Sequence, residues 1–535
     1  MRYIPEEPNA FPPPVPPRIL TEAESLKLTQ MGSPMKGDWP HQELHGPSMV
    51  LEDFEPTESV GANPGSGSIP YTQTEYQSAG SEAPLVLMAT LFALMLAFGL
   101  LLTILIPVGF IGKALSQFNA GEQVLAPIWY GAIAVLSLLV LLRWCTVQTM
   151  AFIAQCKLRR AGARTPELWP LVSVLVPAYQ EGETITSALH SLVNLDYPRY
   201  EIIVVDDGSV DDTFSKASAF AGRHRGCNVE VYRKPNGGKW SALNYGFSLA
   251  RAELILCIDA DSRLSPQALK QLVSRLDHPE IEGVSGQITV RNRRSVITRL
   301  QAYEYIVANG GLRTAQSLMG LVLVVPGPIG LYRRVALLKA WANSTPLSEP
   351  HQPGYVEGPF SHETFAEDFQ LSVTVLALGG RIVYEPRALS YTRSPDSTHS
   401  LLNQRYRWFR GTMQVLKIYV RQLRKPAASK NPNLSVLIVA IYLLDLFVLP
   451  MVNTALIVSV VVSAITSAPI ADLCLWISAV WLLNLMTGTY HILAQRDDLT
   501  LLHLVPIYDL YHGLLLNVAW AIALIDEIRK SKMQW

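Results

Sequence analysis

Residues 254–261 read LILCIDAD, an apolar run that ends in two aspartates. Two similar runs lie upstream, VSVLVPAY at 172–179 and EIIVVDDG at 201–208. Short runs that are apolar throughout and rich in β-branched residues are typical of parallel strands buried on both faces, with amphipathic helices between them. From about residue 168 to 430 the sequence therefore predicts an α/β domain with a mostly parallel central sheet and flanking helices.

The two aspartates of the first run, Asp259 and Asp261, lie at the carboxyl end of their predicted strand. The carboxyl ends of parallel strands meet at one edge of an open α/β sheet, which is where ligands bind. Two carboxylates at this spacing can share one divalent cation with a nucleotide diphosphate, because Mg²⁺ and Mn²⁺ prefer oxygen ligands. We therefore expect Mg²⁺ or Mn²⁺ as the cofactor.

Five residues that follow the other two predicted strands should line the same edge. They are Ala178, Tyr179, Glu181, Asp206 and Asp207. Polar acceptors beside a flat apolar surface suit a base and a ribose. No GxGxxG motif follows the first strand, which argues against a dinucleotide-binding domain.

A glycine pair precedes Lys239 in the segment KPNGGKWSALNYGFSLA at 234–250. The pattern predicts a helix that begins near Lys239, with Asn244 about one turn further on. A helix N-terminus and a lysine together suit a diphosphate, because both present positive charge.

The chain has only 16% charged residues and a mean hydropathy of +0.21, which argues against a purely cytosolic enzyme. Residues 83–147 contain two apolar segments, one uncharged from 84 to 110 and one from about 126 to 142. Each predicts a membrane-spanning helix. The cations from Arg143 onward place the end of the second helix, and hence the α/β domain, in the cytoplasm. The expected location is the plasma (inner) membrane.

Residues 431–527 form a second membrane region, followed by a basic tail at 528–535. Its apolar stretches lie at about 434–466, 473–494 and 501–524. Basic residues lie both before the first stretch and after the last. Three crossings would place these two groups on opposite sides of the membrane, although basic residues favour the cytoplasmic side. The sequence therefore leaves three or four spans open.

Polar side chains within or beside these stretches are costly in a bilayer. They are Asp445, Asn453, Asn484, His491, Asp509 and His512. They would either line a translocation channel or form hydrogen bonds between helices.

Residues 1–82 are rich in Pro, Gly and Ser and hold 12 acidic and 4 basic side chains, which predicts a disordered cytoplasmic tail. In the whole chain 44 basic and 44 acidic residues cancel, so no electrostatic footprint of a nucleic-acid binder is present. The five cysteines have no spacing that suits a zinc site.

The order of motifs resembles the processive family-2 glycosyltransferases, which include cellulose, chitin, hyaluronan and poly-N-acetylglucosamine synthases. The motifs are PAYQE, VVDDGS, NGGKWSALN, DAD, PGPIGLYRR, AED and QRYRW, spread over about 170–420. The resemblance implies a GT-A-type domain embedded between transmembrane helices. Gly327, Pro328 and the pair Arg333 and Arg334 resemble the acceptor-side loop of chitin-type and hyaluronan-type synthases.

The same resemblance assigns roles to individual residues. It places uracil contacts on Ala178, Tyr179, Glu181 and Asp207 with Asp206 beside them, the diphosphate lysine on Lys239, and the metal pair on Asp259 and Asp261. The catalytic base falls on Asp368, preceded by Glu367, although Ala366 stands where many members have Thr. An isolated Glu-Asp pair is as often only the acidic first turn of a helix.

The QRYRW motif gives the remaining assignments by similarity. Gln404 and Trp408 would border the acceptor sugar, and Arg405 and Arg407 would lie near the diphosphate. A Trp face suits a sugar ring, and guanidinium groups suit phosphate oxygens. Without the resemblance, the same residues would read as an interfacial helix held by aromatic side chains and cations.

The implied activity is inverting, processive transfer of a β-linked sugar from a UDP-sugar, with UDP-GlcNAc favoured, and export of the polymer. The expected partners are the UDP-sugar, the polysaccharide, the lipid bilayer, and a small accessory subunit or a second copy of the chain. Three alternatives stay open: a β-glucan synthase that uses UDP-glucose, a non-processive transferase acting on a lipid phosphate, and a transporter or scaffold that only binds nucleotides.

Overall fold

The computed structural model describes residues 84–119, 125–161, 168–344, 354–423, 431–451, 454 and 471–531. The predicted N-terminal tail, residues 455–470 and residues 532–535 of the basic C-terminal tail lie outside the described residues.

A nine-stranded sheet forms the centre of the α/β domain, with the strand order β3-β4-β2-β1-β5-β8-β7-β9-β6. One half is parallel and consists of β4 (Cys227–Arg233), β2 (Tyr200–Asp206), β1 (Val172–Ala178) and β5 (Leu254–Cys257). The other half is mixed and consists of β8 (Gly330–Arg333), β7 (Ile281–Val290) and β9 (Arg381–Thr392). Short antiparallel strands, β3 (Gly222–His224) and β6 (Arg263–Leu264), form the edges. The three strands predicted most clearly are confirmed, and the sheet as a whole is mixed because β8 runs antiparallel to both of its neighbours.

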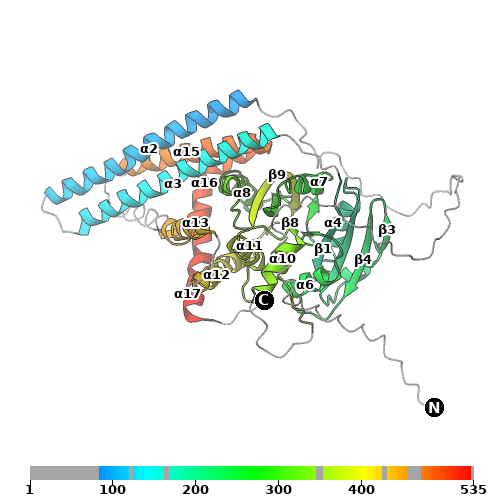
Figure 1. Cartoon of the computed structure of the whole chain (residues 1–535). Helices are drawn as coiled ribbons and strands as arrows, with labels where there is room; N and C mark the ends of the chain where they lie inside the picture. The colour runs from blue at the N-terminus through cyan, green and yellow to red at the C-terminus, as the bar shows by residue number, and fades with distance from the viewer. Residues whose placement is uncertain are drawn as a thin grey trace, which may run out of the picture. The chain divides into compact units, whose positions relative to one another are not determined.

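Helices cover both faces of the sheet, which explains why the parallel strands are apolar throughout (Figure 1). Val174 and Val176 of β1 pack in one cluster with α4 (Ile185–Val193) and α7 (Ala268–Ser274). Leu175, between them, packs on the other face with α6 (Lys239–Leu249) and α11 (Glu367–Ala377). Alternate side chains of one strand thus enter two cores, and the carboxyl ends of β1, β2 and β5 meet at one edge.

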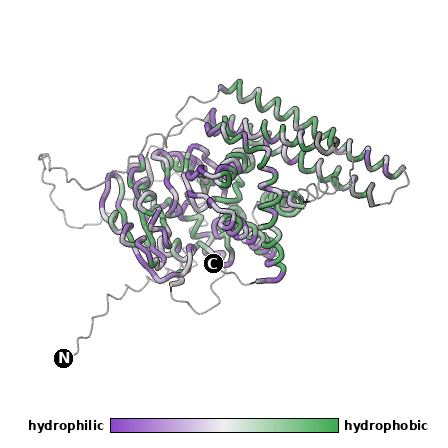
Figure 2. The backbone as a smooth tube through the Cα atoms, turned by 180° about the vertical axis from the view of Figure 1, so that it is seen from behind, coloured by the Kyte–Doolittle hydropathy of each residue, from purple (hydrophilic) through white to green (hydrophobic). Residues whose placement is uncertain are grey.

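Among the described residues, four helical segments are long and apolar enough to cross a membrane: Leu85–Phe118, Tyr130–Arg160, Ile477–Gln495 and Leu499–Arg529. They belong to α2 (Leu85–Asn119), α3 (Leu125–Ala161), α15 (Ala471–Gln495) and the run η4 (Leu499–Leu504), α16 (Val505–Leu510), η5 (Tyr511–Leu516) and α17 (Asn517–Arg529). Figure 2 shows the mainly hydrophobic colouring of α2 and α3. These helices support the prediction of a membrane protein.

The membrane helices α2, α3 and α15 pack against one another through aromatic side chains. The rings of Phe92 on α2 and Phe152 on α3 are stacked with centroids 4.1 Å apart, and Tyr490 of α15 lies 6.1 Å from Phe92. Helix α3 continues without a break past Arg143, where the sequence suggested that the second span ends. Arg143 is 2.6 Å from Asp445 in the π-helix η3 (Leu443–Val448), which follows α13 (Pro432–Tyr442). A cation paired in this way need not mark the end of a span.

Two further pairs of polar residues also connect different membrane helices. Asn484 donates to Asp509 at 3.1 Å, and His491 lies 2.8 Å from the Gln148 amide oxygen. The ring of His512 lies 6.1 Å from that of Tyr508. Asn453 lies outside the described residues. Asp445, Asn484, His491 and Asp509 therefore support hydrogen bonding between helices rather than a channel lining.

Candidate active site

The carboxyl edge of the parallel strands brings together the residues that were predicted from β1, β2 and β5. Ala178 ends β1 and is buried, while Tyr179 follows it with a side chain that is 48% exposed. Asp206 ends β2, and Asp259 comes two residues after β5. The three strands are adjacent in the sheet, so their ends line one crevice.

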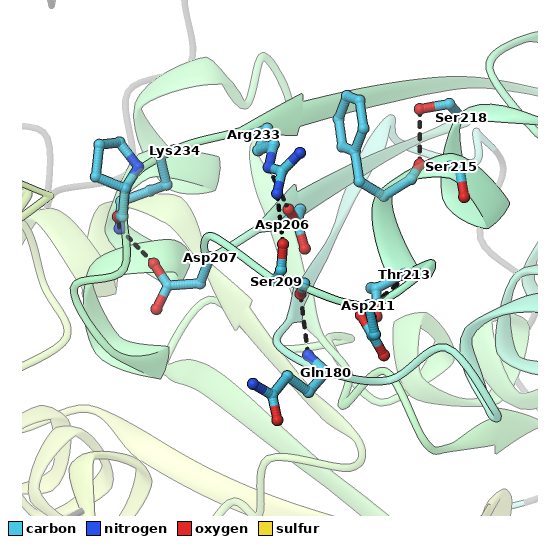
Figure 3. Close-up of polar contacts among 12 residues, drawn as sticks. Gln180, Asp206, Asp207, Ser209, Asp211, Thr213, Ser215, Ser218, Arg233 and Lys234 are labelled. Atoms are coloured by element: carbon cyan, nitrogen blue, oxygen red, sulfur yellow. Dashed lines mark hydrogen bonds and ion pairs between the residues drawn. The ribbon is translucent and has the colours of Figure 1, made fainter.

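Asp206 and Asp207 are buried and bound by side chains and backbone of the neighbouring loop (Figure 3). Asp206 lies 3.1 Å from the Nε of Arg233. Asp207 accepts hydrogen bonds from Lys234 Nζ at 2.5 Å, from the Gly237 N–H at 3.1 Å and from the Gly238 N–H at 2.7 Å. The carboxylate of Asp207 thus fixes the glycine pair in front of α6.

Gly238 needs to be glycine, because its φ of +89° lies in the region that L side chains rarely adopt. Directly after it, Lys239 is the first residue of α6, as predicted. The Nζ of Lys239 is 2.7 Å from Asp259 Oδ1 and 3.5 Å from Glu367 Oε1. Burial would lower the pKa of Lys239, but the charges of Asp259 and Glu367 prevail and raise it. Lys239 therefore stays protonated and joins two motifs that are far apart in the sequence.

A pocket surrounds this ion pair. Its lining consists of Pro177, Lys239, Leu243, Cys257, Ile258, Asp259, Val325, Pro326, Gly327, Gly330, Tyr332, Phe360, Glu367, Asp368 and Leu371. Gly327 closes over the ion pair, since a Cβ on it would lie 2.5 Å from Lys239 Nζ and 2.9 Å from Asp259 Oδ1. Any side chain here would displace the lysine or the aspartate.

Asp261 and Glu181 add two carboxylates on the side of Asp259. Asp261 accepts from Ser262 Oγ at 2.9 Å, and its pKa is raised by burial and by the charge of Asp259. The pKa of Glu181 is also raised, first by burial and then by Asp261 and Asp259, against a hydrogen bond from Thr184. Such carboxylates repel one another, and a divalent cation bound between them would neutralise their charge.

The donor chemistry therefore fits Mg²⁺ or Mn²⁺ at Asp259 and Asp261. Within the described part of the chain, no three acidic, imidazole or thiol side chains form a complete metal site. A cation held here would need further ligands from water or from the phosphates of a nucleotide.

Asp368 lies in the first turn of α11, next to Glu367. The Asp368 Oδ1 accepts a hydrogen bond from the Phe369 N–H at 2.7 Å. Burial and the neighbouring Glu367 raise the pKa of Asp368 to about 6, while Lys239 acts in the opposite direction. At neutral pH this carboxylate is still mostly ionised and can accept a proton.

Asn244, which follows Lys239 by five positions, holds the loop in front of α11 rather than facing the pocket. Its Nδ2 donates to the carbonyl oxygens of Val356 at 2.9 Å and Phe360 at 3.0 Å, and its Oδ1 accepts from the Phe360 N–H at 3.0 Å. The segment with the glycine pair thus positions both Lys239 and the approach to Asp368.

The QRYRW motif lies on α12 (Thr398–Leu423), and its residues differ in environment. Arg405 is buried, donates to Glu304 Oε2 at 2.7 Å, and lies 4.2 Å from the centre of the Trp408 ring. Trp408 is 43% exposed and stacks on Tyr305 with centroids 6.4 Å apart. Arg405 thus supports an exposed aromatic shelf, and its ion pair is with Glu304.

The other two members of the motif lie beside this shelf. Arg407 is exposed. The side-chain oxygen of Gln404 is buried, with no hydrogen-bond partner in the described part of the chain. Glu304 and Tyr305 were not singled out from the sequence, because nothing in the helical stretch around them indicates their contact with a motif about 100 residues away.

Arg333 and Arg334 lie away from the pocket. In the antiparallel pairing of β8 with β5, Gly330 is opposite Cys257 and Arg333 is opposite Leu254, at the other end of β5. Arg333 Nε donates to the carbonyl of Ile281 at 2.9 Å. Of the segment PGPIGLYRR, Pro326, Gly327, Gly330 and Tyr332 line the pocket, whereas the two arginines do not.

Residues 173–341 match the family described as Glycosyl transferase family 2. A poly-β-1,6-N-acetyl-D-glucosamine synthase of Staphylococcus epidermidis is 30% identical over 246 residues, which are 46% of this chain and 55% of that protein. An N-acetylglucosaminyltransferase of Rhizobium sp. (strain N33) is 32% identical over 263 residues, which are 48% and 56% of the two chains. The matches thus span about half the length of these relatives.

Among solved structures, a mannosyltransferase from Pyrobaculum calidifontis in complex with GDP-Man and Mn²⁺ has a TM-score of 0.49 at 19% identity, and the match covers 75% of this chain and 99% of that one. The family match shows that this chain contains a family-2 glycosyltransferase domain, as the order of the motifs indicated. Its α/β sheet with flanking helices agrees with the expected GT-A type of fold.

Proposed function

We propose that this protein is an inverting, processive polysaccharide synthase that transfers GlcNAc from UDP-GlcNAc to a growing chain. One observation carries the proposal: Lys239, Asp259, Glu367 and Asp368 line one pocket, so a cation for the leaving group lies beside a carboxylate that can act as base. The names of the relatives, a poly-β-1,6-GlcNAc synthase and a GlcNAc transferase, favour this sugar.

In the proposed reaction, Asp368 accepts the proton of the acceptor hydroxyl while the hydroxyl oxygen attacks the anomeric carbon. The bond from that carbon to the UDP oxygen breaks on the opposite face, so an α-linked donor gives a β-linked product. Lys239 donates hydrogen bonds to the departing diphosphate, where negative charge develops. Asp259 and Asp261 would hold Mg²⁺ or Mn²⁺, which supplies further neutralisation of the diphosphate when bound.

The remaining site residues take binding roles in this proposal. Ala178, Tyr179 and Glu181 would border the uridine, whereas Asp206 and Asp207 would position the loops around it. Gln404 and Trp408 would border the acceptor sugar, with Arg407 near the diphosphate and Arg405 holding the Trp408 ring through the contact described above.

The membrane helices give the proposal its location. A polysaccharide cannot cross hydrocarbon unaided, so synthesis beside membrane helices suits export of the growing chain. The four candidate spans support an integral membrane protein. We propose that the catalytic domain lies on the cytoplasmic side of the plasma membrane, because UDP-sugars are made in the cytoplasm.

The test is UDP release by the purified full chain in lipid nanodiscs with Mg²⁺ or Mn²⁺. UDP-GlcNAc, UDP-glucose and UDP-glucuronate are offered singly and in pairs, and product length and linkage are measured. Long polymer from UDP-GlcNAc alone is the expected result. Polymer from UDP-glucose alone, or a single sugar transferred to lipid, would refute it.

A matched variant, Asp368→Asn, separates catalysis from binding. It should lower the rate about 10²- to 10⁴-fold, because that is what a general base contributes. UDP binding, measured by calorimetric titration, should remain. An Asp368→Asn protein that polymerises at the normal rate would contradict the assigned base and would favour a chain that only binds nucleotides.

A further inference from the structure

A π-helical turn, η2 (Asn309–Arg313), lies between α8 (Val296–Ala308) and α9 (Thr314–Met319) and contacts the membrane helices. A Cβ added to Gly310 would lie 2.5 Å from His491 Nδ1 and 2.6 Å from Gln495 Nε2, both on α15. A Cβ added to Gly311 would lie 3.4 Å from Gln148 Nε2 on α3. The two glycines therefore let this turn pack closely against α15 and α3. Turns of this kind occur often at functional sites.

Arg313 ends the same turn and contacts the catalytic domain. Its guanidinium carbon lies 5.9 Å from the centre of the Tyr384 ring on β9. Its Nη1 is buried and has no hydrogen-bond partner among the described residues. A buried donor without a partner costs free energy, and more so when it is charged. A ligand that accepts a hydrogen bond would remove this cost.

The charge of Asp368 is among those that act on Arg313. Burial lowers the pKa of Arg313, and the groups that oppose this effect are Tyr384, Asp368 and Tyr305. Tyr305 is the ring that stacks on Trp408. Arg313 thus lies within electrostatic reach of both Asp368 and the exposed aromatic shelf of the QRYRW helix.

Three other arginines differ from Arg313 because carboxylates bind them. Arg405 donates to Glu304 at 2.7 Å, and Arg293 donates to Asp497 at 2.9 Å. Arg233 lies 3.1 Å from Asp206. No such ion pair is formed by Arg313 among the described residues, so its donors remain available to a substrate.

We propose that Arg313 binds the acceptor, donating hydrogen bonds to the terminal sugar of the growing chain and holding its attacking hydroxyl at Asp368. This inference rests on the proposed function. A guanidinium group only donates, so its partners would be hydroxyl oxygens or an N-acetyl carbonyl. The diphosphate is a weaker candidate for the ligand of Arg313, because the proposal already assigns the diphosphate to Lys239, which pairs with Asp259 in the pocket.

The test compares Arg313→Gln and Arg313→Lys with the wild type, as full chains in nanodiscs. Initial rates are measured against the concentration of a soluble oligosaccharide acceptor built from whichever sugar the wild type polymerises. Arg313→Gln should raise the acceptor KM about 30-fold, equivalent to about 2 kcal/mol at 1.4 kcal/mol per tenfold. UDP binding should change less than about twofold, since the donor side is untouched, and Arg313→Lys should recover part of the loss because it keeps the charge.

Arg334→Gln serves as the matched control. Arg334 also lies over an aromatic ring, at 5.1 Å from the centre of Phe247, but near the amino end of β5. It should leave the acceptor KM unchanged. Thermal unfolding of all three variants reports any loss of structure separately.

Two results would overturn the proposal: an unchanged acceptor KM in Arg313→Gln, or an equal loss of UDP binding. If Arg313→Gln does not fold, Arg313→Lys decides by the same two measurements. The proposed function is tested independently, since a wild-type protein that makes no polymer from UDP-GlcNAc would refute it. A wild type that polymerises another UDP-sugar still tests Arg313 with that sugar.

Discussion

The pH dependence of kcat/KM gives a direct test of Asp368 as the base. Its pKa is raised to about 6, and the base works only when ionised. Activity should therefore fall to half at pH 6 and to about one-eleventh at pH 5 as the carboxyl takes up a proton. An aspartate with an ordinary pKa of about 3.9 would still be more than about 90% ionised at pH 5. The two cases differ about tenfold at that pH.

A variant of the neighbouring Glu367 tests whether the fall of activity at low pH, the acidic limb of the profile, is due to Asp368. Glu367 raises the pKa of Asp368, so Glu367→Gln should move the limb to lower pH. Glu363→Gln is the matched control, because Glu363 lies on the same loop and accepts from Gln370 at 3.1 Å. It should leave the limb in place.

The assay is UDP release in nanodiscs between pH 5 and 8, repeated at two concentrations of the divalent cation. An acidic limb that moves with the cation concentration would report protonation of Asp259 and Asp261 instead of Asp368. A profile that is flat down to pH 5, or a Glu367→Gln limb at higher pH, would refute the reasoning.

Three further predictions follow from contacts around the pocket. Gly411→Ala should lower kcat at least about tenfold with UDP binding intact, because the new Cβ would lie 2.8 Å from the Ala366 Cβ and displace the turn that carries Asp368. A normal kcat would show that the turn tolerates the shift. Asp207→Ala removes the hydrogen bonds that hold the loop before Lys239 and should weaken UDP binding about tenfold or more in calorimetric titration, whereas unchanged affinity would contradict the positioning role. Asp368→Asn should raise the midpoint of thermal unfolding at pH 7. The pKa of Asp368 is about 6 in the folded protein against about 3.9 in the unfolded chain, so the ionised carboxylate destabilises the fold above pH 6, by about 3 kcal/mol at most. An equal or lower midpoint would contradict this sign.

The parallel half of the sheet and the carboxylates at its edge were predictable because local sequence determines them. A strand buried on both faces is apolar at every position, and its carboxylates follow directly in the chain. The direction of β8 was not predictable in this way, since it depends on pairing with strands that are distant in sequence. The candidate spans were predictable from apolar length, whereas the ion pair of Arg143 with Asp445, about 300 residues away, was not.

Within the site, residue types were easier to predict than their partners. Lys239 and Asp259 were expected at one edge, and they form an ion pair there. Asp207 and Arg405 were expected to face the nucleotide, and the protein partners that hold them, Gly238 and Glu304, were not predicted. Such contacts depend on tertiary packing, which a single sequence does not encode in any local pattern.

The close packing of η2 against α15 has a practical consequence for inhibitor discovery. A water-soluble fragment limited to the α/β domain would uncover Gly310 and Gly311 and would remove one partner of Gln287, whose Nε2 donates to Gln495 at 2.8 Å. Compounds selected on such a fragment would meet a surface that the intact enzyme covers with helix. Screening against the acceptor side of the pocket therefore calls for the whole chain in a bilayer, where the turn that carries Arg313 keeps its support.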